Sequence, residues 1–350
     1  MLRKHVRKAL CLPALAAAAV LMLTGCGNPE AKEAFEAAAA ALDEGRISEA
    51  EAGFAALIEE GEFLSESWRG TGIIQLLSEK PADACISFEK ARLYAEDQSP
   101  DYLRDVDMYL AAARTEHGEA AKALAIYDEI LAEAYDPETA FLRGSLLLKS
   151  GEAEKAAEDF SSIAAENVNS DLMIAISDLY RMNGYAAEAD EYLEKIIAGG
   201  SSVDAARRGL AHYYLEEYPE AETDLRDAVA AGPLDSDALI LLGQALLAQE
   251  RTEAARALFK EYSGDQSAAS LCGLALCDMA DGNYEDALAR IEAGLALGDE
   301  TAAQGLAYNE IAVLEYLGRW DEAKAKARAY AAAYPTDKAG ILENAFLKTR

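Results

Sequence analysis

The sequence contains few of the residues from which metal centres, disulfide frameworks and β-sheets are usually built. Its 350 residues include only three histidines, five cysteines and eight prolines. A zinc site needs at least three protein ligands, and an odd number of cysteines cannot close into a complete disulfide framework. The long stretches between glycines also lack the strict alternation of apolar and polar residues that marks a half-buried strand. These shortages favour a helical protein without a metal centre.

Basic residues are also scarce. Lys and Arg number 32 against 63 Asp and Glu, which gives a net charge of −31. Four of the basic residues lie in the first eight positions, so the rest of the chain holds 28 basic and 63 acidic residues, a net charge of −35. Such a field repels phosphate backbones, and we therefore expect no nucleic-acid partner. The charge is typical of a solvated exterior and would also favour a basic partner surface.

The motifs of common enzyme classes are missing as well. No phosphate-binding loop, dinucleotide fingerprint, nucleophile elbow or zinc-protease helix occurs in the chain. His212 and Glu216 lie four residues apart, but two groups are too few for a zinc site. Asp281 and Asn283 begin a spacing like that of a calcium loop, whose sixth position should be glycine but here is Asp286. We therefore expect no catalytic residues, no cofactor and no bound metal.

The first 25 residues have the composition of an export signal. A basic start, with Arg3 and Lys8 at its ends, is followed by an uncharged apolar stretch from Ala9 toward Leu23. The stretch ends in Leu-Thr-Gly-Cys at residues 23–26. This segment resembles the signal peptide and lipobox of bacterial lipoproteins, in which cleavage precedes the cysteine and a diacylglycerol is attached to it. The resemblance implies removal of residues 1–25, lipidation of Cys26 and a short linker over residues 26–30.

An ordinary membrane-spanning anchor is the alternative, but the apolar stretch is short for a span and the terminal Gly-Cys would be unexplained. The lipoprotein resemblance implies an exported protein, anchored by its lipid to the extracytoplasmic face of a bacterial membrane. Two acyl chains would make that anchor stable, because one chain alone binds only marginally. Gly27, in place of aspartate after the cysteine, is compatible with outer-membrane sorting, and the choice between inner and outer membrane stays open.

One pair of small and large residues recurs nine times in the remaining chain. In eight pairs an alanine is followed four places later by a bulkier apolar residue, and the ninth is degenerate: Ala50/Phe54, Ala84/Phe88, Ala123/Tyr127, Ala156/Phe160, Ala189/Leu193, Ala221/Leu225, Ala255/Phe259, Ala287/Ile291 and Ala323/Ala327. The mean interval of about 34 residues is the length of one helix–turn–helix repeat. Residues i and i+4 share one helix face, so each pair predicts a buried seam that stacked neighbours complete.

A second set of small residues lies twelve places before these alanines, with Ile311 as the exception: Ala38, Gly72, Ala111, Gly144, Ser177, Gly209, Gly243, Ala275 and Ile311. The second repeat adds Trp68 and Ala91 at the expected places. This pattern resembles the tetratricopeptide repeat (TPR) family. The resemblance implies an all-α fold, an α-solenoid of about nine helix–turn–helix units over residues 31–336. We expect a C-terminal capping helix over residues 337–350, and the face that covers the last seam would carry Ile341, Leu342, Ala345 and Phe346.

The turns inside the repeats carry their own signal. Six glycines each precede a repeat alanine by five residues: Gly45, Gly118, Gly151, Gly184, Gly282 and Gly318. We expect them to adopt the left-handed conformation that ends the first helix. Pro81 and Pro219 instead mark the start of a second helix, where proline is tolerated. Longer intervals after Ala84 and Ala287 predict insertions in loops or at helix ends.

In the TPR family, the exposed face of each first helix lines a channel that holds a partner segment. Carrying over the lining positions, which lie three before, one after, and four or five after the small residue, gives Phe35, Arg69, Met108, Phe141, Ser145, Asp178, Arg181, Tyr213, Tyr214, Gln244, Tyr308, Glu315 and Tyr316. The lysines and asparagines of the family's clamp for C-terminal carboxylates are mostly replaced by apolar residues. Any of these side chains could instead pack against a neighbouring repeat.

The two resemblances together imply a membrane-anchored, non-catalytic scaffold that binds a protein or peptide partner at the bacterial cell envelope. Two other classes stay open. A solute- or glycan-binding accessory lipoprotein would have an enclosed pocket. An enzyme, or the regulatory subunit of an envelope enzyme, would have converging carboxylates with raised pKa values.

Overall fold

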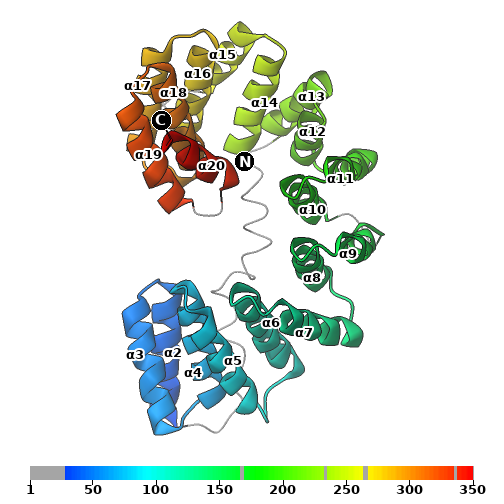
Figure 1. Ribbon diagram of the computed structural model, residues 1–350, viewed down its shortest axis with the longest axis vertical. Helices are drawn as coiled ribbons and strands as arrows, with labels where there is room; N and C mark the ends of the chain where they lie inside the picture. The colour runs from blue at the N-terminus through cyan, green and yellow to red at the C-terminus, as the bar shows by residue number, and fades with distance from the viewer. Residues whose placement is uncertain (1–27, 166–168, 232–234, 263–266, 335–336, 350) are drawn as a thin grey trace. The chain divides into compact units, whose positions relative to one another are not determined.

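The computed structural model describes residues 28–165, 169–231, 235–262, 267–334 and 337–349. In this part of the chain every extended regular element is a helix (Figure 1), which confirms the all-α class. The chain divides into two compact units, with the boundary between Asn167 and Val168. Each unit is a stack of helical hairpins.

The N-terminal unit contains four hairpins, formed by α2 (Pro29–Asp43), α3 (Ile47–Glu60), α4 (Leu64–Leu77), α5 (Pro81–Leu93), α6 (Pro100–Glu116), α7 (Ala120–Glu133), α8 (Pro137–Lys149) and α9 (Ala153–Ala165). Helix α2 begins at Pro29, within the stretch expected as a linker. The Asn28 side chain caps it by accepting a hydrogen bond from the Glu30 amide at 3.1 Å, and proline fits the first helical turn.

The C-terminal unit contains five hairpins and a final helix. Its elements are α10 (Ser170–Met182), α11 (Ala186–Ala198), the short 3₁₀ turn η1 (Gly200–Ser202), α12 (Ala205–Tyr214), α13 (Tyr218–Ala230), α14 (Ser236–Ala248), α15 (Thr252–Glu261), α16 (Ala268–Ala280), α17 (Tyr284–Ala296), α18 (Glu300–Tyr316), α19 (Trp320–Ala333) and α20 (Lys338–Leu347). Within each unit, the second helix of a repeat packs against the first helix of the same repeat. Where another repeat follows in that unit, it also packs against the first helix of that repeat.

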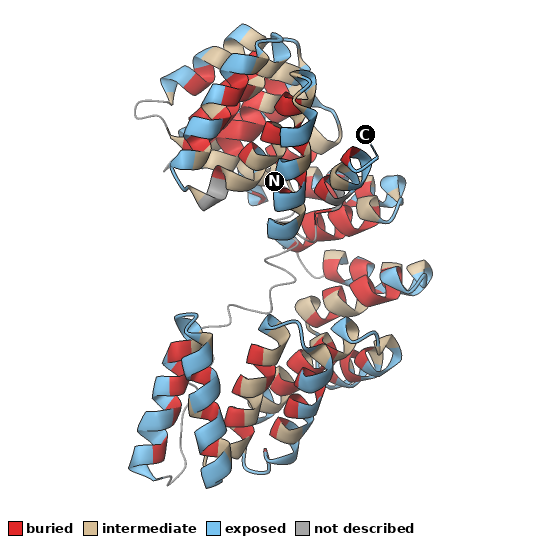
Figure 2. Ribbon diagram, turned by 60° about the vertical axis from the view of Figure 1, so that its left-hand side comes forward, coloured by how far each residue is buried: buried red, intermediate tan, exposed pale blue. Residues whose placement is uncertain are grey.

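The repeated small–large pairs form the seams of these stacks. All nine alanines and their partners four residues on are buried, as the red faces between helices in Figure 2 illustrate. A Cβ atom added to Gly72 would stand 2.7 Å from the Phe88 ring, and one added to Gly144 would stand 2.6 Å from Phe160. The aromatic side chain of the second helix therefore occupies the space that the glycine of the first helix leaves open.

The turn glycines adopt the expected left-handed conformation. All six have φ values between 71° and 87°. Three repeats reach the same turn without glycine, because Glu79, Glu216 and Glu250 have φ values of 57°, 62° and 59°. Pro81 and Pro219 both lie in the first turn of their second helices. The two long intervals between repeat alanines correspond to α6 and α18, which each have 17 residues.

An ion pair recurs inside several repeats, between a first-helix residue and the residue sixteen places later on the second helix. Arg143 pairs with Asp159 in the fourth repeat at 2.5 Å, and Arg208 pairs with Asp224 in the sixth at 2.6 Å. The ninth repeat has the opposite order of charge, with Glu310 bound by Lys326 at 2.6 Å. Asp159 and Glu310 are buried, so each needs its partner to remain ionised at low cost.

Helix α20 uses a different face from the one expected. Gly340 and Leu347 are buried, and the Tyr330 ring of α19 lies against Gly340. Leu342 and Phe346 are 69% and 44% exposed, so they do not cover the seam of the last repeat. The helix is rotated because close approach to Tyr330 is possible only at the glycine.

Residues 1–27, which hold the expected export signal and the lipidation site Cys26, lie outside the described residues. From residue 28 on, within the described ranges, none of the helices combines the length and apolar character needed to cross a membrane. The lipoprotein assignment therefore stays a prediction from the sequence.

Candidate binding surface

The first helices of successive repeats lie beside one another within each unit. In the C-terminal unit α12 packs against α14, and α14 packs against both α16 and α18. In the N-terminal unit α4 packs against α2 and α6. One face of each unit is therefore built from first helices, and this is the face on which the sequence places a partner segment.

Four residues expected to line this face are buried instead: Phe35, Phe141, Ser145 and Asp178. The Phe35 ring lies 5.9 Å from the Phe54 ring and 5.5 Å from the Phe63 ring. The Phe141 ring lies 6.2 Å from that of Phe160. Phe35 and Phe141 lie three places before the small residue and Ser145 and Asp178 lie one place after it, and in these repeats both positions fall between helices. These four side chains belong to the core, which corrects the expectation.

Arg69 and Met108 connect neighbouring repeats. The Arg69 guanidinium forms an ion pair with Asp105 of α6 and lies 5.1 Å from the centroid of the Tyr109 ring. The Met108 sulfur accepts a hydrogen bond from the Thr139 hydroxyl of α8 at 3.6 Å. The Arg69 side chain is therefore engaged within the N-terminal unit and does not stand ready to pair with an acidic partner.

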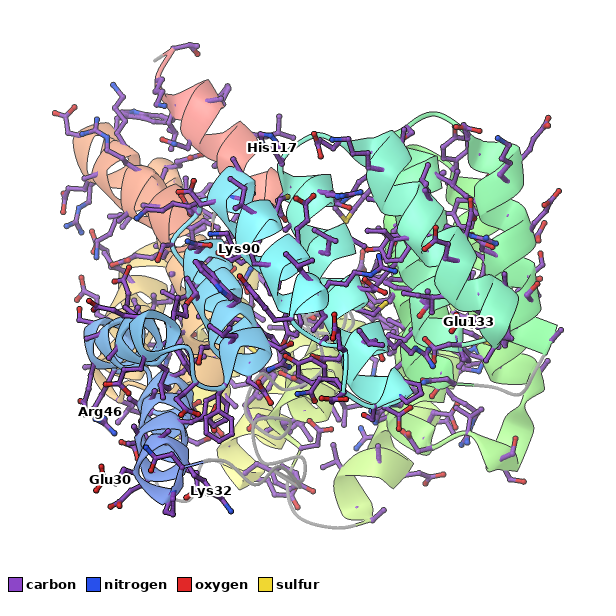
Figure 3. The ribbon with its side chains drawn as sticks, turned by 90° about the horizontal axis from the view of Figure 1, so that it is seen from below. Glu30, Lys32, Arg46, Lys90, His117 and Glu133 are labelled. Carbon is purple, nitrogen blue, oxygen red and sulfur yellow. The ribbon has the colours of Figure 1, made fainter. Side chains whose placement is uncertain are left out.

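Many of the other cations in the described ranges are also engaged with neighbouring side chains. In the N-terminal unit, Arg46 pairs with Glu44 at 2.9 Å, and the Lys90 ammonium lies 3.8 Å from the centroid of the Trp68 ring. Figure 3 labels both cations, Arg46 and Lys90. Within the described ranges, fourteen arginines form an ion pair with a carboxylate. Because acidic residues outnumber basic ones about two to one, the surface charge that remains is negative.

Arg181 and two tyrosines form a cluster where the fifth and sixth repeats meet. The Arg181 guanidinium pairs with Asp190, donates a hydrogen bond to the Tyr214 carbonyl oxygen at 3.2 Å, and lies 6.0 Å from the Tyr214 ring centroid. The Tyr213 ring meets Tyr214 edge-on at 5.5 Å. Burial raises the pKa of Tyr213. All three side chains keep part of their surface accessible.

Further along the same face, Gln244, Tyr308 and Glu315 are half-buried and Tyr316 is exposed. Three more half-buried residues share this face but are missing from the expected set: Leu247, Leu276 and Met279. They occupy the same repeat positions, so applying the position rule to every repeat would have found them. Leu276, Met279 and Tyr308 pack beside a core that contains Ile240 and Cys272.

Three carboxyl groups in the described ranges have raised pKa values. Burial is the main cause of the raised pKa values of Asp43, Asp107 and Glu138, and none of these three is an electrostatic partner of another. His212 lies between Glu217, at 2.7 Å, and Asp224, at 3.6 Å. No group of three potential metal ligands occurs among the described residues.

Comparison with known proteins agrees with this architecture. Residues 206–269 match the family model for the tetratricopeptide repeat. The structure of yeast Tom70 is 12% identical and has a TM-score of 0.51, with 91% of this chain and 81% of that chain covered. No curated protein matches the sequence.

Two further solved structures are similar over shorter parts of this chain. A tetratricopeptide repeat protein from Parabacteroides merdae is 16% identical, with a TM-score of 0.44 over 69% of this chain and 96% of that one. The C-terminal part of a TPR repeat-containing protein from Cytophaga hutchinsonii is 15% identical, with a TM-score of 0.38, and the match covers 67% of this chain and 97% of that one.

The likeness to Tom70 shows the fold of this chain, and the family match supports it over residues 206–269. The chain is an α-helical repeat protein with the TPR fold, and its repeats are identified at the sequence level in the sixth and seventh hairpins. Domains of this class bind protein partners. The fold carries no information about which partner is bound.

Proposed function

We propose that the protein is an exported, lipid-anchored and non-catalytic scaffold that binds a segment of another protein at the bacterial cell envelope. The TPR fold supports the binding role. The Leu-Thr-Gly-Cys sequence at residues 23–26 supports the anchor. Only Gly27 and Asn28 separate Cys26 from the start of α2, so the first repeat would lie close to the membrane surface.

One observation carries the binding proposal. Consecutive first helices of the C-terminal unit leave a set of mostly apolar and aromatic side chains half-accessible on one face: Tyr213, Gln244, Leu247, Leu276, Met279 and Tyr308. Large side chains of this kind act as anchors in protein interfaces, because they bury much area with few rotatable bonds. Their spacing by repeats suits an extended partner segment.

Site-specific photo-crosslinking in intact cells tests this face. We expect a benzoylphenylalanine residue at Gln244 or Leu276 of the full chain to crosslink to a protein partner. The same residue at Glu253, which is exposed on the second helix α15, serves as the control and should crosslink much less. Equal crosslinking at Glu253, or none at the first-helix positions, would contradict the proposal.

Metabolic labelling with an alkyne fatty acid tests the anchor. We expect wild-type protein to incorporate the label and to sediment with membranes, and Cys26→Ser to lose both properties. Cys85→Ser should keep the label, because Cys85 is a buried thiol inside the repeat array. An unlabelled wild-type protein, or a labelled Cys26→Ser variant, would show that the protein is not a lipoprotein.

A further inference from the structure

A half-buried tyrosine and an exposed tyrosine stack on each other at the junction of the last two repeats. The rings of Tyr284, the first residue of α17, and Tyr316, the last residue of α18, are 4.6 Å apart and within 3° of parallel. Tyr316 is 66% exposed, although one face of its ring is covered by Tyr284. Much of its remaining surface is therefore open to solvent, which is unusual for a large aromatic side chain held in a fixed orientation.

An equivalent junction in the same chain shows what such a ring can hold. Tyr214 occupies the position in the sixth repeat that Tyr316 occupies in the ninth, because each lies five residues after the mid-helix position that holds Gly209 and Ile311. The guanidinium of Arg181, from the preceding repeat, lies 6.0 Å from the Tyr214 ring centroid. The residue at the position of Arg181 in the eighth repeat is Met279. The ninth repeat thus has the tyrosine without the internal arginine.

The charge around the tyrosine stack is suited to a cation. Glu285 and Asp286 follow Tyr284 and are exposed, and Asp321 is exposed at the start of α19. The nearby cation, Arg319, is bound by both carboxylate oxygens of Glu322 at 2.7 and 2.6 Å. Glu285 and Glu292 also act on the Arg319 guanidinium. The local field therefore favours a positive group, and Arg319 is already paired.

We propose that the Tyr284–Tyr316 stack is a docking site for an arginine side chain from a basic segment of a partner protein. The guanidinium plane would stack on the open face of Tyr316 and its N–H groups would face the carboxylates of Glu285 and Asp286. Cations are attracted to aromatic faces by the ring quadrupole, and guanidinium is the side chain that most often uses this contact. This inference rests on the proposed binding function and names the chemistry of the partner.

Fluorine NMR on the full chain labelled with 3-fluorotyrosine tests the proposal. The Tyr316 resonance is identified by its loss in Tyr316→Phe. A short peptide of alternating glycine and arginine should shift the Tyr316 and Tyr284 resonances, and the matched citrulline peptide, which is neutral, should not. The affinity of each variant for the arginine peptide is measured from the shift of the Tyr284 resonance. We expect Tyr316→Ala to weaken binding of this peptide about two- to fivefold, as for the loss of one exposed cation–π contact, and Tyr316→Phe to weaken it much less.

Tyr94→Ala is the matched control, because Tyr94 is 48% exposed in the N-terminal unit and should not affect the titration. Equal shifts with arginine and citrulline peptides would overturn the proposal, as would shifts only with a neutral oligosaccharide. The titration uses purified protein and defined peptides, so a failure of the crosslinking at Gln244 leaves its outcome unchanged. The two proposals can therefore fail separately.

Discussion

In the first eight repeats, the large side chain of the second helix contributes to stability because the first-helix position that faces it carries a small side chain or none. Phe160 is fully buried and its ring fills the space beside Gly144. The surrounding helices cannot close that space without shifting the backbone. Stability at the residue scale therefore depends on the match of a glycine or alanine with an aromatic or aliphatic partner.

Truncating one of these aromatic side chains should leave a cavity that the neighbours cannot fill. We expect Phe160→Ala to lower the free energy of unfolding by about 3–5 kcal/mol, as for other buried phenylalanines. Phe160→Leu should lower it by clearly less. Urea unfolding followed by circular dichroism measures both. A loss below about 1 kcal/mol for the alanine variant would show that the helices collapse onto the gap.

The three glutamates in left-handed turns offer a second test at this scale. A residue with a Cβ atom loses about 1–2 kcal/mol in this conformation, and part of that is recovered because glycine has more freedom in the unfolded chain. We expect Glu250→Gly to raise the free energy of unfolding by about 0.5–1 kcal/mol. Gly184→Ala should lower it by a similar amount. Thermal or urea unfolding midpoints measure both variants. Changes of the same sign in the free energy of unfolding for Glu250→Gly and Gly184→Ala would contradict this prediction.

Paired charges connect the two helices of a repeat. The order is arginine on the first helix and aspartate on the second in the fourth and sixth repeats, and it is reversed in the ninth. Glu310 is almost fully buried, whereas Lys326 is about half exposed. The pair matters because the carboxylate has little contact with water and relies on the ammonium group.

Removing the Lys326 ammonium should therefore lower the stability of the fold, whereas exchanging the charges of Glu310 and Lys326 should largely preserve it. We expect Lys326→Ala to destabilise the protein by about 3 kcal/mol, near the lower end for breaking a buried pair. The double variant Glu310→Lys, Lys326→Glu should recover most of that loss, since the fourth and sixth repeats use this order. Arg328→Ala on the same helix, where the side chain is exposed, should have little effect. A double variant no better than Lys326→Ala would contradict this account.

At the scale of the whole molecule, buried groups that resist ionisation occur in both compact units. Burial raises the pKa of Tyr109 and of Tyr127 to about 12 in the N-terminal unit. In the C-terminal unit it raises the pKa of Cys272 to about 12 and that of Cys277 to about 11. Each group is held in its neutral, protonated form by the fold.

These shifts predict loss of stability at alkaline pH. An unfolded thiol ionises near pH 9 and an unfolded tyrosine near pH 10, so above pH 9 the unfolded chain loses protons that the folded chain keeps. The free energy of unfolding should therefore fall as the pH rises from 9 toward 12. Urea midpoints at pH 8 and pH 10.5 measure the effect. Cys272→Ala should make the fall shallower, and a midpoint that rises with pH would contradict the argument.

The sequence predicts the repeat architecture well because the same pattern of small, large and turn residues recurs in almost every repeat. The paired small and large residues, the turn glycines, and Pro81 and Pro219 all occupy the places that the pattern assigned. Glu79, Glu216 and Glu250 could not be recognised as turn residues, because glutamate normally avoids the left-handed region and only the surrounding helices impose it.

The candidate surface was less predictable than the fold. Whether Phe141 or Gln244 reaches solvent depends on how closely adjacent first helices approach, and residue spacing within one helix does not determine that distance. Likewise, Leu342 and Phe346 have the apolar character of a covered face, but close contact of Tyr330 with Gly340 sets the rotation of α20. Contacts between repeats decide exposure, and a single sequence reports them poorly.

The reversed charge order in the ninth repeat limits how the gene could be rearranged. Recombination between similar repeats commonly shortens or lengthens such arrays by joining the front of one to the back of another. A hybrid with the first helix of the ninth repeat and the second helix of the fourth would bring Glu310 against Asp159, two carboxylates in a site with little water. One of the two carboxyl groups would have to take up a proton, so we expect such a crossover product to be less stable than the parent chain.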